Sequence, residues 1–263
     1  MSELKINFKY EHGSAETGKL DLYDASVALN GISRSLSIIT HAYINGEVRT
    51  HGEAARGAKF YINTPKRGSF IFEAVIFFGS SVVGGVFYDF VKYALNEAVG
   101  KMDQGENYSK ALIKRIEPTI GELPAVLESP LYDVHRPIRK DHEITLTASR
   151  PRGEVLASFD SDTALYLLPT TANAPHPISG NVTKYNSLTG WGRFFDITEG
   201  RTVSFNISLD SPDYQRSLIT WSLHEHNMGR DGILFLKAKA VITPSGKIKR
   251  YIVEEISNTP FRH

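Results

Sequence analysis

Residues 203–256 read VSFNISLDSPDYQRSLITWSLHEHNMGRDGILFLKAKAVITPSGKIKRYIVEEI, and this stretch decides the fold. Apolar and polar residues alternate in three segments, which is the period-two pattern of β-strands; the segments are Val203 to Leu209, Ile233 to Ile242 and Ile248 to Ile256. Pro212 to His226 is predicted to be a helix, with proline at its favoured first-turn position. Thr243-Pro244-Ser245-Gly246 predicts a turn, so the last two strands should form a long hairpin.

Two further strands precede this stretch, over Val182 to Tyr185 and over Arg193 to Ile197. The turn residues Thr189-Gly190 and Glu199-Gly200 separate the strands. Three strands, a helix and two more strands is the element order of the small five-stranded barrel called the OB fold. The sequence therefore predicts a small C-terminal OB-like five-stranded β-barrel.

The N-terminal hundred residues predict a sheet with helices. Strands are expected over Leu4 to Tyr10, Leu20 to Leu22, Ala58 to Asn63 and Ser69 to Phe78, with a hairpin turn at Thr64 to Gly68. A long helix should follow Asp24, since apolar residues recur at spacings of three and four from Leu29 to Tyr43, and Asn45-Gly46 should end it. Ser80 or Ser81 is expected to cap a second helix through Phe87 and Leu95.

The fold class is thus α+β, with an N-terminal sheet-plus-helices unit before the barrel. The domains are expected at residues 1–102, the N-terminal α+β domain, at 103–177, a helical and strand connecting region, and at 178–263, the barrel with one helix. In the connecting region, short helices are expected over Tyr108 to Ile116 and Thr119 to Leu127, strands over Glu143 to Ala148 and Glu154 to Phe159, and an irregular linker over Thr170 to Pro177.

Composition narrows the function classes. Thirty Lys and Arg residues nearly balance 29 Asp and Glu residues among 263, so the net charge is +1 and nucleic acid or anionic membrane would have to bind a local patch. The absence of cysteine removes disulfides, thiolate zinc sites and cysteine nucleophiles. The start MSELKINFKYEHG has no apolar region behind a basic segment, so we expect a cytoplasmic protein. The longest uncharged stretch, Ala74 to Tyr88, has 15 residues, too few for constitutive membrane insertion.

The barrel strands carry aromatic and basic side chains that suit a single-stranded nucleic acid or a nucleotide. Bases stack on rings while phosphates pair with Lys and Arg; the candidates are Tyr185, Trp191, Arg193, Lys247, Lys249 and Arg250. The alternative is an ordinary solvent face, as for Lys237 and Lys239, which alternate with alanines. From Ile178 onward, 11 basic residues oppose 8 acidic ones, fewer than in a strongly basic nucleic-acid binder.

Other motifs give weaker signals. His224 and His226 are two residues apart, which points them to different sides of a helix, whereas zinc pairs on helices are spaced by four. Gly79 to Gly85 is a glycine-rich segment at a helix start but lacks the lysine of a phosphate-binding loop. We therefore assign no catalytic residue, no metal ligand and no cofactor. Whether the chain is an enzyme stays open, with a binding role favoured.

Val75 to Tyr93 is apolar nearly all round, and a domain of about a hundred residues need not be able to enclose it. We therefore expect self-association, with a protein partner as a further option, through an interface at Phe77, Phe78, Val82, Val83, Phe87 and Phe90. The alternatives are an ordinary core and a membrane-acting effector that inserts residues 74–95 after a trigger.

The sequence also resembles a group of uncharacterised bacterial and phage-borne proteins. The resemblance rests on Lys19-Leu20-Asp21-Leu22-Tyr23-Asp24-Ala25, on Lys66-Arg67-Gly68-Ser69-Phe70 before an apolar strand, and on a C-terminal Gly-Lys-Ile-x-x-Tyr-x-Val pattern at residues 246–253. It implies an origin in mobile elements or antiviral defence loci and no activity. Together these features predict a non-catalytic, homo-oligomerising binding or assembly protein, with nucleic-acid binding and membrane action as alternatives.

Overall fold

The computed structural model describes residues 2–50, 55–63, 70–80, 82–102, 108–151 and 153–261. Contacts within the chain divide it into two compact units. The sheet unit comprises Met1–Thr119 and Leu123–Leu167, and the barrel unit comprises Ile120–Glu122 and Leu168–His263. The predicted α+β class, a sheet with helices followed by a small β-barrel, is confirmed.

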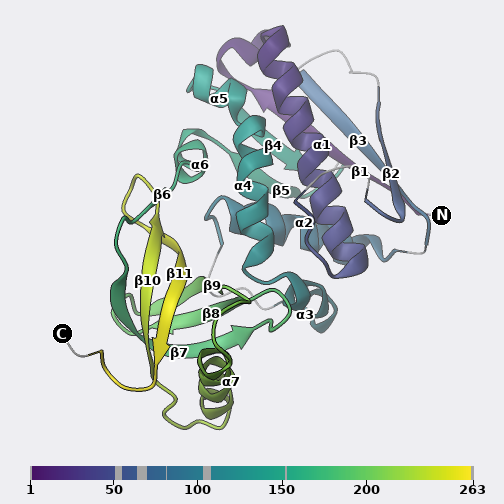
Figure 1. Cartoon of the computed structure of the whole chain (residues 1–263). Coiled ribbons are helices and arrows are strands. Elements are labelled where there is room, and N and C mark those ends of the chain that lie inside the picture. Colours follow the sequence, from purple (N-terminus) through teal and green to yellow (C-terminus); the bar gives the residue numbers. More distant parts are fainter. Residues whose placement is uncertain are drawn as a thin grey trace. The chain divides into compact units, whose positions relative to one another are not determined.

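The sheet unit contains a five-stranded antiparallel sheet in the order β2-β3-β1-β4-β5 (Figure 1). Its strands are β1 (Ser2–Glu11), β2 (Ala58–Ile62), β3 (Phe70–Phe78), β4 (Thr145–Ser149) and β5 (Val155–Phe159). The central strand β1 buries Ile6, Phe8 and Tyr10 on one face, as its alternation predicts. The predicted hairpin turn at residues 64–68 lies outside the described residues.

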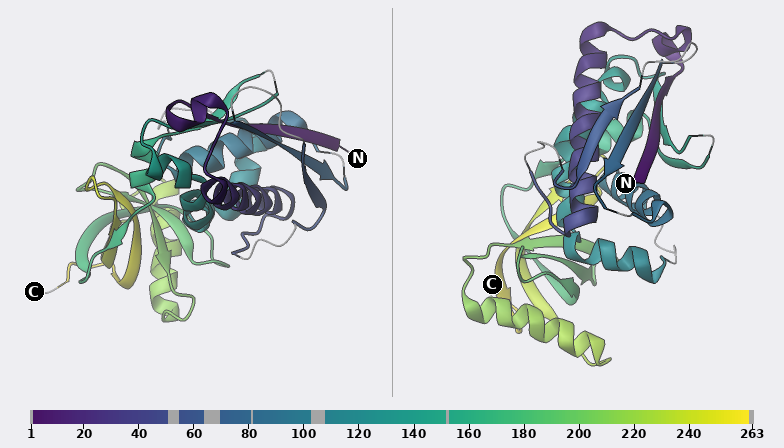
Figure 2. Two further views of the ribbon diagram at one scale, coloured as in Figure 1. Left: turned by 90° about the horizontal axis from the view of Figure 1, so that it is seen from above. Right: turned by 90° about the vertical axis from the view of Figure 1, so that its right-hand side faces the viewer.

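Helices cover the apolar face of this sheet. They are α1 (Leu22–Asn45), α2 (Gly84–Ala98), α3 (Lys110–Ile116), α4 (Glu122–Val134), α5 (Arg136–Lys140) and α6 (Ser161–Tyr166), with short 3₁₀ turns η1 (Gly13–Thr17) and η2 (Glu117–Thr119). Helices α1 and α4 run side by side (Figures 1 and 2). Gly31 permits this approach, since a Cβ atom there would lie 2.5 Å from the carbonyl oxygen of Pro130.

The start of α1 differs from the prediction. Leu20 to Leu22 is not a strand, and Asp21 rather than Asp24 caps the helix, because its Oδ1 accepts hydrogen bonds from the amides of Tyr23 at 2.9 Å and Asp24 at 3.0 Å. The Asp24 carboxylate instead pairs with Arg136 at 2.6 Å. The predicted C-terminal stop is confirmed, since Gly46 has φ +68° and its amide donates to Ala42 O.

Helix α2 carries the aromatic core of the sheet unit. Its N-cap is Val83, whose side chain makes no capping hydrogen bond, so the predicted cap at Ser80 is wrong, and Ser81 lies outside the described residues. Phe87 contacts Tyr43 and Phe78 edge to face, with ring centroids 5.2 Å and 5.1 Å apart. One copy of the chain therefore encloses this cluster.

The barrel unit closes through five strands in the circular order β7-β8-β9-β11-β10, with β10 returning to β7. The strands are β7 (His176–Tyr185), β8 (Trp191–Asp196), β9 (Arg201–Ile207), β10 (Leu234–Ile242) and β11 (Ile248–Ser257). Strands β9 and β11 are parallel, and the other neighbours are antiparallel. Helix α7 (Asp213–Asn227) lies between the third and fourth strands in sequence, so the predicted OB-like element order is confirmed.

Two local details of the barrel unit depart from the prediction. The expected irregular linker Thr170 to Pro177 contains the short strand β6 (Thr170–Thr171), which pairs with the end of β10, and the first residues of β7. Pro177 fits there because it is near the beginning of its strand. Pro212 is the N-cap of α7 rather than its first helical residue.

Buried polar contacts fix the helix and the strand ends of the barrel. Ser222 Oγ accepts from the amide of Val182 at 3.0 Å and donates to Gly232 O at 2.6 Å, which joins α7 to two other segments. The hydroxyl of Tyr251 donates to Asp196 Oδ2 at 2.6 Å inside the barrel. Within the described part of the chain, no helix has the length and apolarity needed to cross a bilayer.

Candidate functional site

Strand register places basic residues in one row across the outside of the barrel. Arg193 on β8 is opposite Ser204 on β9, and Ser204 is opposite Arg250 on β11. Each of these residues alternates with inward-facing core residues, for example Phe194, Phe205 and Tyr251. The two guanidinium groups therefore belong to the same outer face, two strands apart.

Aromatic side chains flank this row. Trp191 and Phe195 are two residues before and after Arg193 on β8, so all three side chains share the outer face. Phe195 is 38% exposed, and Trp191 is half-buried opposite Asn206. The outer face of β8 thus presents Arg193 and the exposed ring of Phe195, whereas Gly121 lies close to Trp191, since a Cβ atom on this glycine would be 3.2 Å from Trp191 Cε3.

Tyr185 does not belong to this surface, contrary to the prediction. A β-bulge between Val182 and Lys184 shifts the alternation of β7, so Tyr185 is opposite the inward-facing Gly192. Its ring stacks on Phe205 with centroids 6.2 Å apart and an interplanar angle of 6°. Burial raises the pKa of the Tyr185 hydroxyl, and the nearby charge of Arg216 opposes the rise.

Lys184 takes the outward position that the bulge denies to Tyr185. It is opposite Arg193 and exposed, and it extends the basic row to a third strand. Lys184 lies within the predicted strand Val182 to Tyr185, but it is not one of the predicted site residues. The bulge depends on pairing with β8, and no local signal in the sequence marks it.

The remaining predicted basic residues lie at the β10–β11 hairpin. Lys247 is exposed in the turn, where its amide donates to Thr243 Oγ1 at 3.0 Å, and Lys249 is half-buried in β11 next to Arg250. Lys237 and Lys239 on β10 pair with Glu255 and Glu254, each at 2.7 Å. The carboxylates neutralise that part of the barrel, which agrees with the solvent-face interpretation.

The six residues expected at an oligomer interface do not share a surface. Phe78, Phe87 and Phe90 are at most 1% exposed in a single copy, because they pack in the core of the sheet unit. They cannot form a contact surface in this state, so that part of the prediction is wrong. Phe77 and Val82 are partly buried, and Val83 is 69% exposed.

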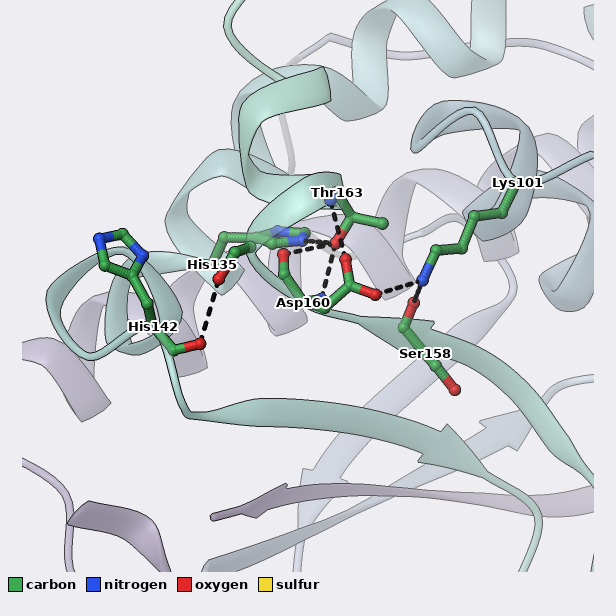
Figure 3. Close-up of polar contacts among 7 residues, drawn as sticks. Lys101, His135, His142, Ser158, Asp160 and Thr163 are labelled. Atoms are coloured by element: carbon green, nitrogen blue, oxygen red, sulfur yellow. Dashed lines mark hydrogen bonds and ion pairs between the residues drawn. The ribbon is translucent and has the colours of Figure 1, made fainter. Parts of the chain in front are cut away.

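The buried His135 belongs to a polar network in the sheet unit, which Figure 3 draws. His135 Nδ1 lies 2.7 Å from Leu131 O, which can only accept, so this nitrogen carries the proton. Nε2 then accepts from Thr163 Oγ1 at 2.9 Å. The network continues to Asp160, whose Oδ1 accepts from the Thr163 amide at 2.9 Å, and to Lys101, whose Nζ lies 2.7 Å from Asp160 Oδ2.

The electrostatics of this network favour a structural role. Burial lowers the pKa of His135 to about 4, so the imidazole is neutral near pH 7. Burial raises the pKa of Asp160, but hydrogen bonds from Lys101 and Thr163 outweigh it and leave the carboxyl below its ordinary value. Asp160 and Thr163 form a capping box at the start of α6. Each polar group thus has a structural partner.

His41 on α1 is 2% exposed, and its Nδ1 lies 3.1 Å from Asn45 Nδ2. Burial and then the charge of Arg49 lower its pKa. His224 is exposed, with its side chain 64% accessible. Among the described residues, no group of three His, Asp or Glu side chains is arranged to hold a metal ion.

Two family models match the chain, one over each unit. A family model described as Domain of unknown function (DUF7946) matches residues 6–167. The chain belongs to the DUF7946 family. A second model, described as Family of unknown function (DUF7947), matches residues 174–257 of this DUF7946 chain, which hold the barrel strands. No curated protein and no solved structure matches the chain.

Proposed function

We propose that the chain is a non-catalytic binding protein whose barrel binds single-stranded nucleic acid. The observation that carries the proposal is the basic row of Lys184, Arg193 and Arg250, with Trp191 and Phe195 beside it on β8. OB folds bind oligonucleotides through the face of their second and third strands and through the loops after strands one and four. Here these are β8, β9, the β7–β8 loop and the β10–β11 turn that holds Lys247.

The chemistry of this face supports a single strand over a duplex. Bases of any sequence can stack on exposed rings, and base–aromatic stacking contributes about 1–3 kcal/mol per base. Phosphates pair with the arginines, whose guanidinium groups can bind two oxygens at once. A duplex hides its bases, so only the phosphate contacts would remain.

Fluorescence anisotropy of a labelled 15-nucleotide single strand tests the proposal. We expect binding that weakens with salt, and a salt slope reduced by about 0.7 for each phosphate contact removed. Arg193→Ala and Arg250→Ala should each weaken binding. The matched control is Lys239→Ala, because Lys239 is a barrel cation on β10, outside the second and third strands, and pairs with Glu254. Equal loss in all three variants, or no binding at low salt, would contradict the proposal.

Self-association is a second proposal, and a different surface supports it. Phe77 faces away from the helices and packs edge to face on Tyr61 of the edge strand β2, with centroids 5.5 Å apart. Tyr61 is 56% exposed. Light scattering should show a discrete oligomer that Tyr61→Lys converts to monomer; a wild-type monomer at micromolar concentration would refute it. This proposal includes an origin of the chain in bacterial or phage-borne antiviral defence loci.

A further inference from the structure

The sheet unit contains a cavity that combines an apolar floor with a cationic mouth. Its volume is about 390 Å³. It is lined by Tyr43 from α1, Val83 and Val86 from the start of α2, and Ala111, Lys114 and Arg115 from α3. Ligand sites typically measure about 300–1,000 Å³, so this cavity suits a small ligand.

The floor is apolar and partly open. Val83 is 69% exposed, which is unusual for a valine next to the aromatic core, and Val86 is half-buried against that core. Tyr43 is 4% exposed and anchors the wall through its edge-to-face contact with Phe87. An aliphatic chain placed here would cover Val83 and remove its apolar surface from water.

The charge at the mouth is positive. Helix α3 reads KALIKRI and contains three basic residues and no acidic one. Arg115 is held in place, because its Nη1 donates to Tyr43 O at 2.9 Å and its guanidinium carbon lies 4.7 Å from the centre of the Tyr43 ring. Lys114 is exposed and lines the cavity. The first turn of α2, which holds no acidic residue, adds the positive end of its dipole.

A second cavity of the sheet unit also has lysines in its lining, but these lysines are paired with carboxylates. It has a volume of about 290 Å³ and includes Lys92 and Lys101 in its lining. Lys92 pairs with Glu154 at 2.9 Å, and Lys101 pairs with Asp160 at 2.7 Å. The carboxylates therefore cancel the lysine charges there, whereas none of the described residues that line the cavity under α3 is acidic.

We propose that the cavity formed by Tyr43, Val83, Val86, Ala111, Lys114 and Arg115 binds a small single-chain amphiphile with an anionic head, such as a medium-chain acyl carboxylate. The carboxylate lies between Lys114 and Arg115, and the acyl chain lies on Val83 and Val86. This site is separate from the barrel face and does not depend on its function.

The test uses the fluorescent apolar anion 8-anilinonaphthalene-1-sulfonate on the folded full chain, with decanoate as competitor. We expect one saturable dye site per chain, displaced by decanoate but not by acetate, which lacks the chain, or by decanol, which lacks the charge. Lys114→Ala should weaken decanoate binding at least fivefold. Lys110→Ala, one turn away on the same helix and outside the cavity lining, is the control and should leave it unchanged.

A second variant separates binding from folding. Val83 is the N-cap of α2, where aspartate is a favoured residue, so Val83→Asp should not lower the melting temperature. It places a carboxylate on the cavity floor and should weaken decanoate binding at least tenfold. Binding unchanged in Val83→Asp and Lys114→Ala, or equal displacement by decanol and decanoate, would overturn the proposal.

Discussion

His135 should make the sheet unit sensitive to acid, and its replacement by asparagine should remove that part of the sensitivity. His135 is fully buried, its ring packs edge to face on Phe159 at 5.2 Å, and burial lowers its pKa to about 4. In the unfolded chain the histidine regains its ordinary pKa of about 6.5. Between these two values the unfolded chain takes up a proton that the folded chain does not, so stability falls as the pH decreases.

The size of the effect follows from the two pKa values. Each pH unit between them costs about 1.4 kcal/mol, so His135 should account for about 2 kcal/mol of lost stability between pH 7 and pH 5. The asparagine amide can still donate to Leu131 O, where His135 donates over 2.7 Å. His135→Asn loses packing on Phe159, but this loss is the same at both pH values.

Denaturant unfolding at pH 7 and pH 5 measures how much the free energy of unfolding of the wild type and of His135→Asn changes with pH. Circular dichroism at 222 nm follows the helices, most of which are in the sheet unit, and tryptophan fluorescence follows the barrel unit, which holds both tryptophans, Trp191 and Trp221. Between pH 7 and pH 5, the free energy of unfolding from the dichroism transition should fall by about 2 kcal/mol less in the variant than in the wild type. The pH dependence of the fluorescence transition should not change. Equal pH dependence of both proteins by dichroism would refute the reasoning.

Three substitutions test the buried contacts and one helix position. Ser222→Ala leaves a buried amide and a buried carbonyl without their partner and should cost the barrel about 2–3 kcal/mol, measured by tryptophan fluorescence; a cost below about 0.5 kcal/mol would contradict this. Tyr251→Phe removes the donor to the buried Asp196 and should cost about 2 kcal/mol in the same assay, and unchanged stability would show that this contact contributes nothing. Gly85→Ala adds a Cβ atom that meets nothing within 4 Å in α2, so it should stabilise the sheet unit by about 0.5–1 kcal/mol in the dichroism transition. A loss of stability would reveal a steric need for this glycine.

The barrel could be predicted because its signals are local. Alternation over Ile233 to Ile242 and over Ile248 to Ile256, with Pro244 and Gly246 between them, determines a hairpin without reference to the rest of the chain. The stop of α1 at Gly46 is equally local. Such elements follow from residue type and spacing.

Whether Tyr185 faces the inside or the outside of the barrel could not be predicted, because its orientation depends on a bulge in the pairing of β7 with β8. The core role of Phe78 and Phe87 was only an alternative in the sequence analysis, for a related reason. Strands β4 and β5 join the same sheet from residues 145–159, so the unit that encloses these rings is larger than the hundred N-terminal residues. Non-local pairing determines both outcomes.

The His135 network also depends on distant residues. Lys101, His135 and Asp160 are far apart in sequence, and only Asp160 and Thr163, at the spacing of a capping box, give a local signal.

Fluorescence of the two tryptophans tests the central claim most directly. Trp191 is on the proposed nucleic-acid face, and Trp221 is 38% exposed on α7, a helix that Ser222 joins to β7 through the amide of Val182. Trp221→Phe leaves Trp191 as the reporter, and Trp191→Phe leaves Trp221. Stacked bases quench an indole, so titration with a single strand should quench the Trp221→Phe protein and leave the Trp191→Phe protein unchanged. Quenching of neither reporter, or of both equally, would contradict binding at this face.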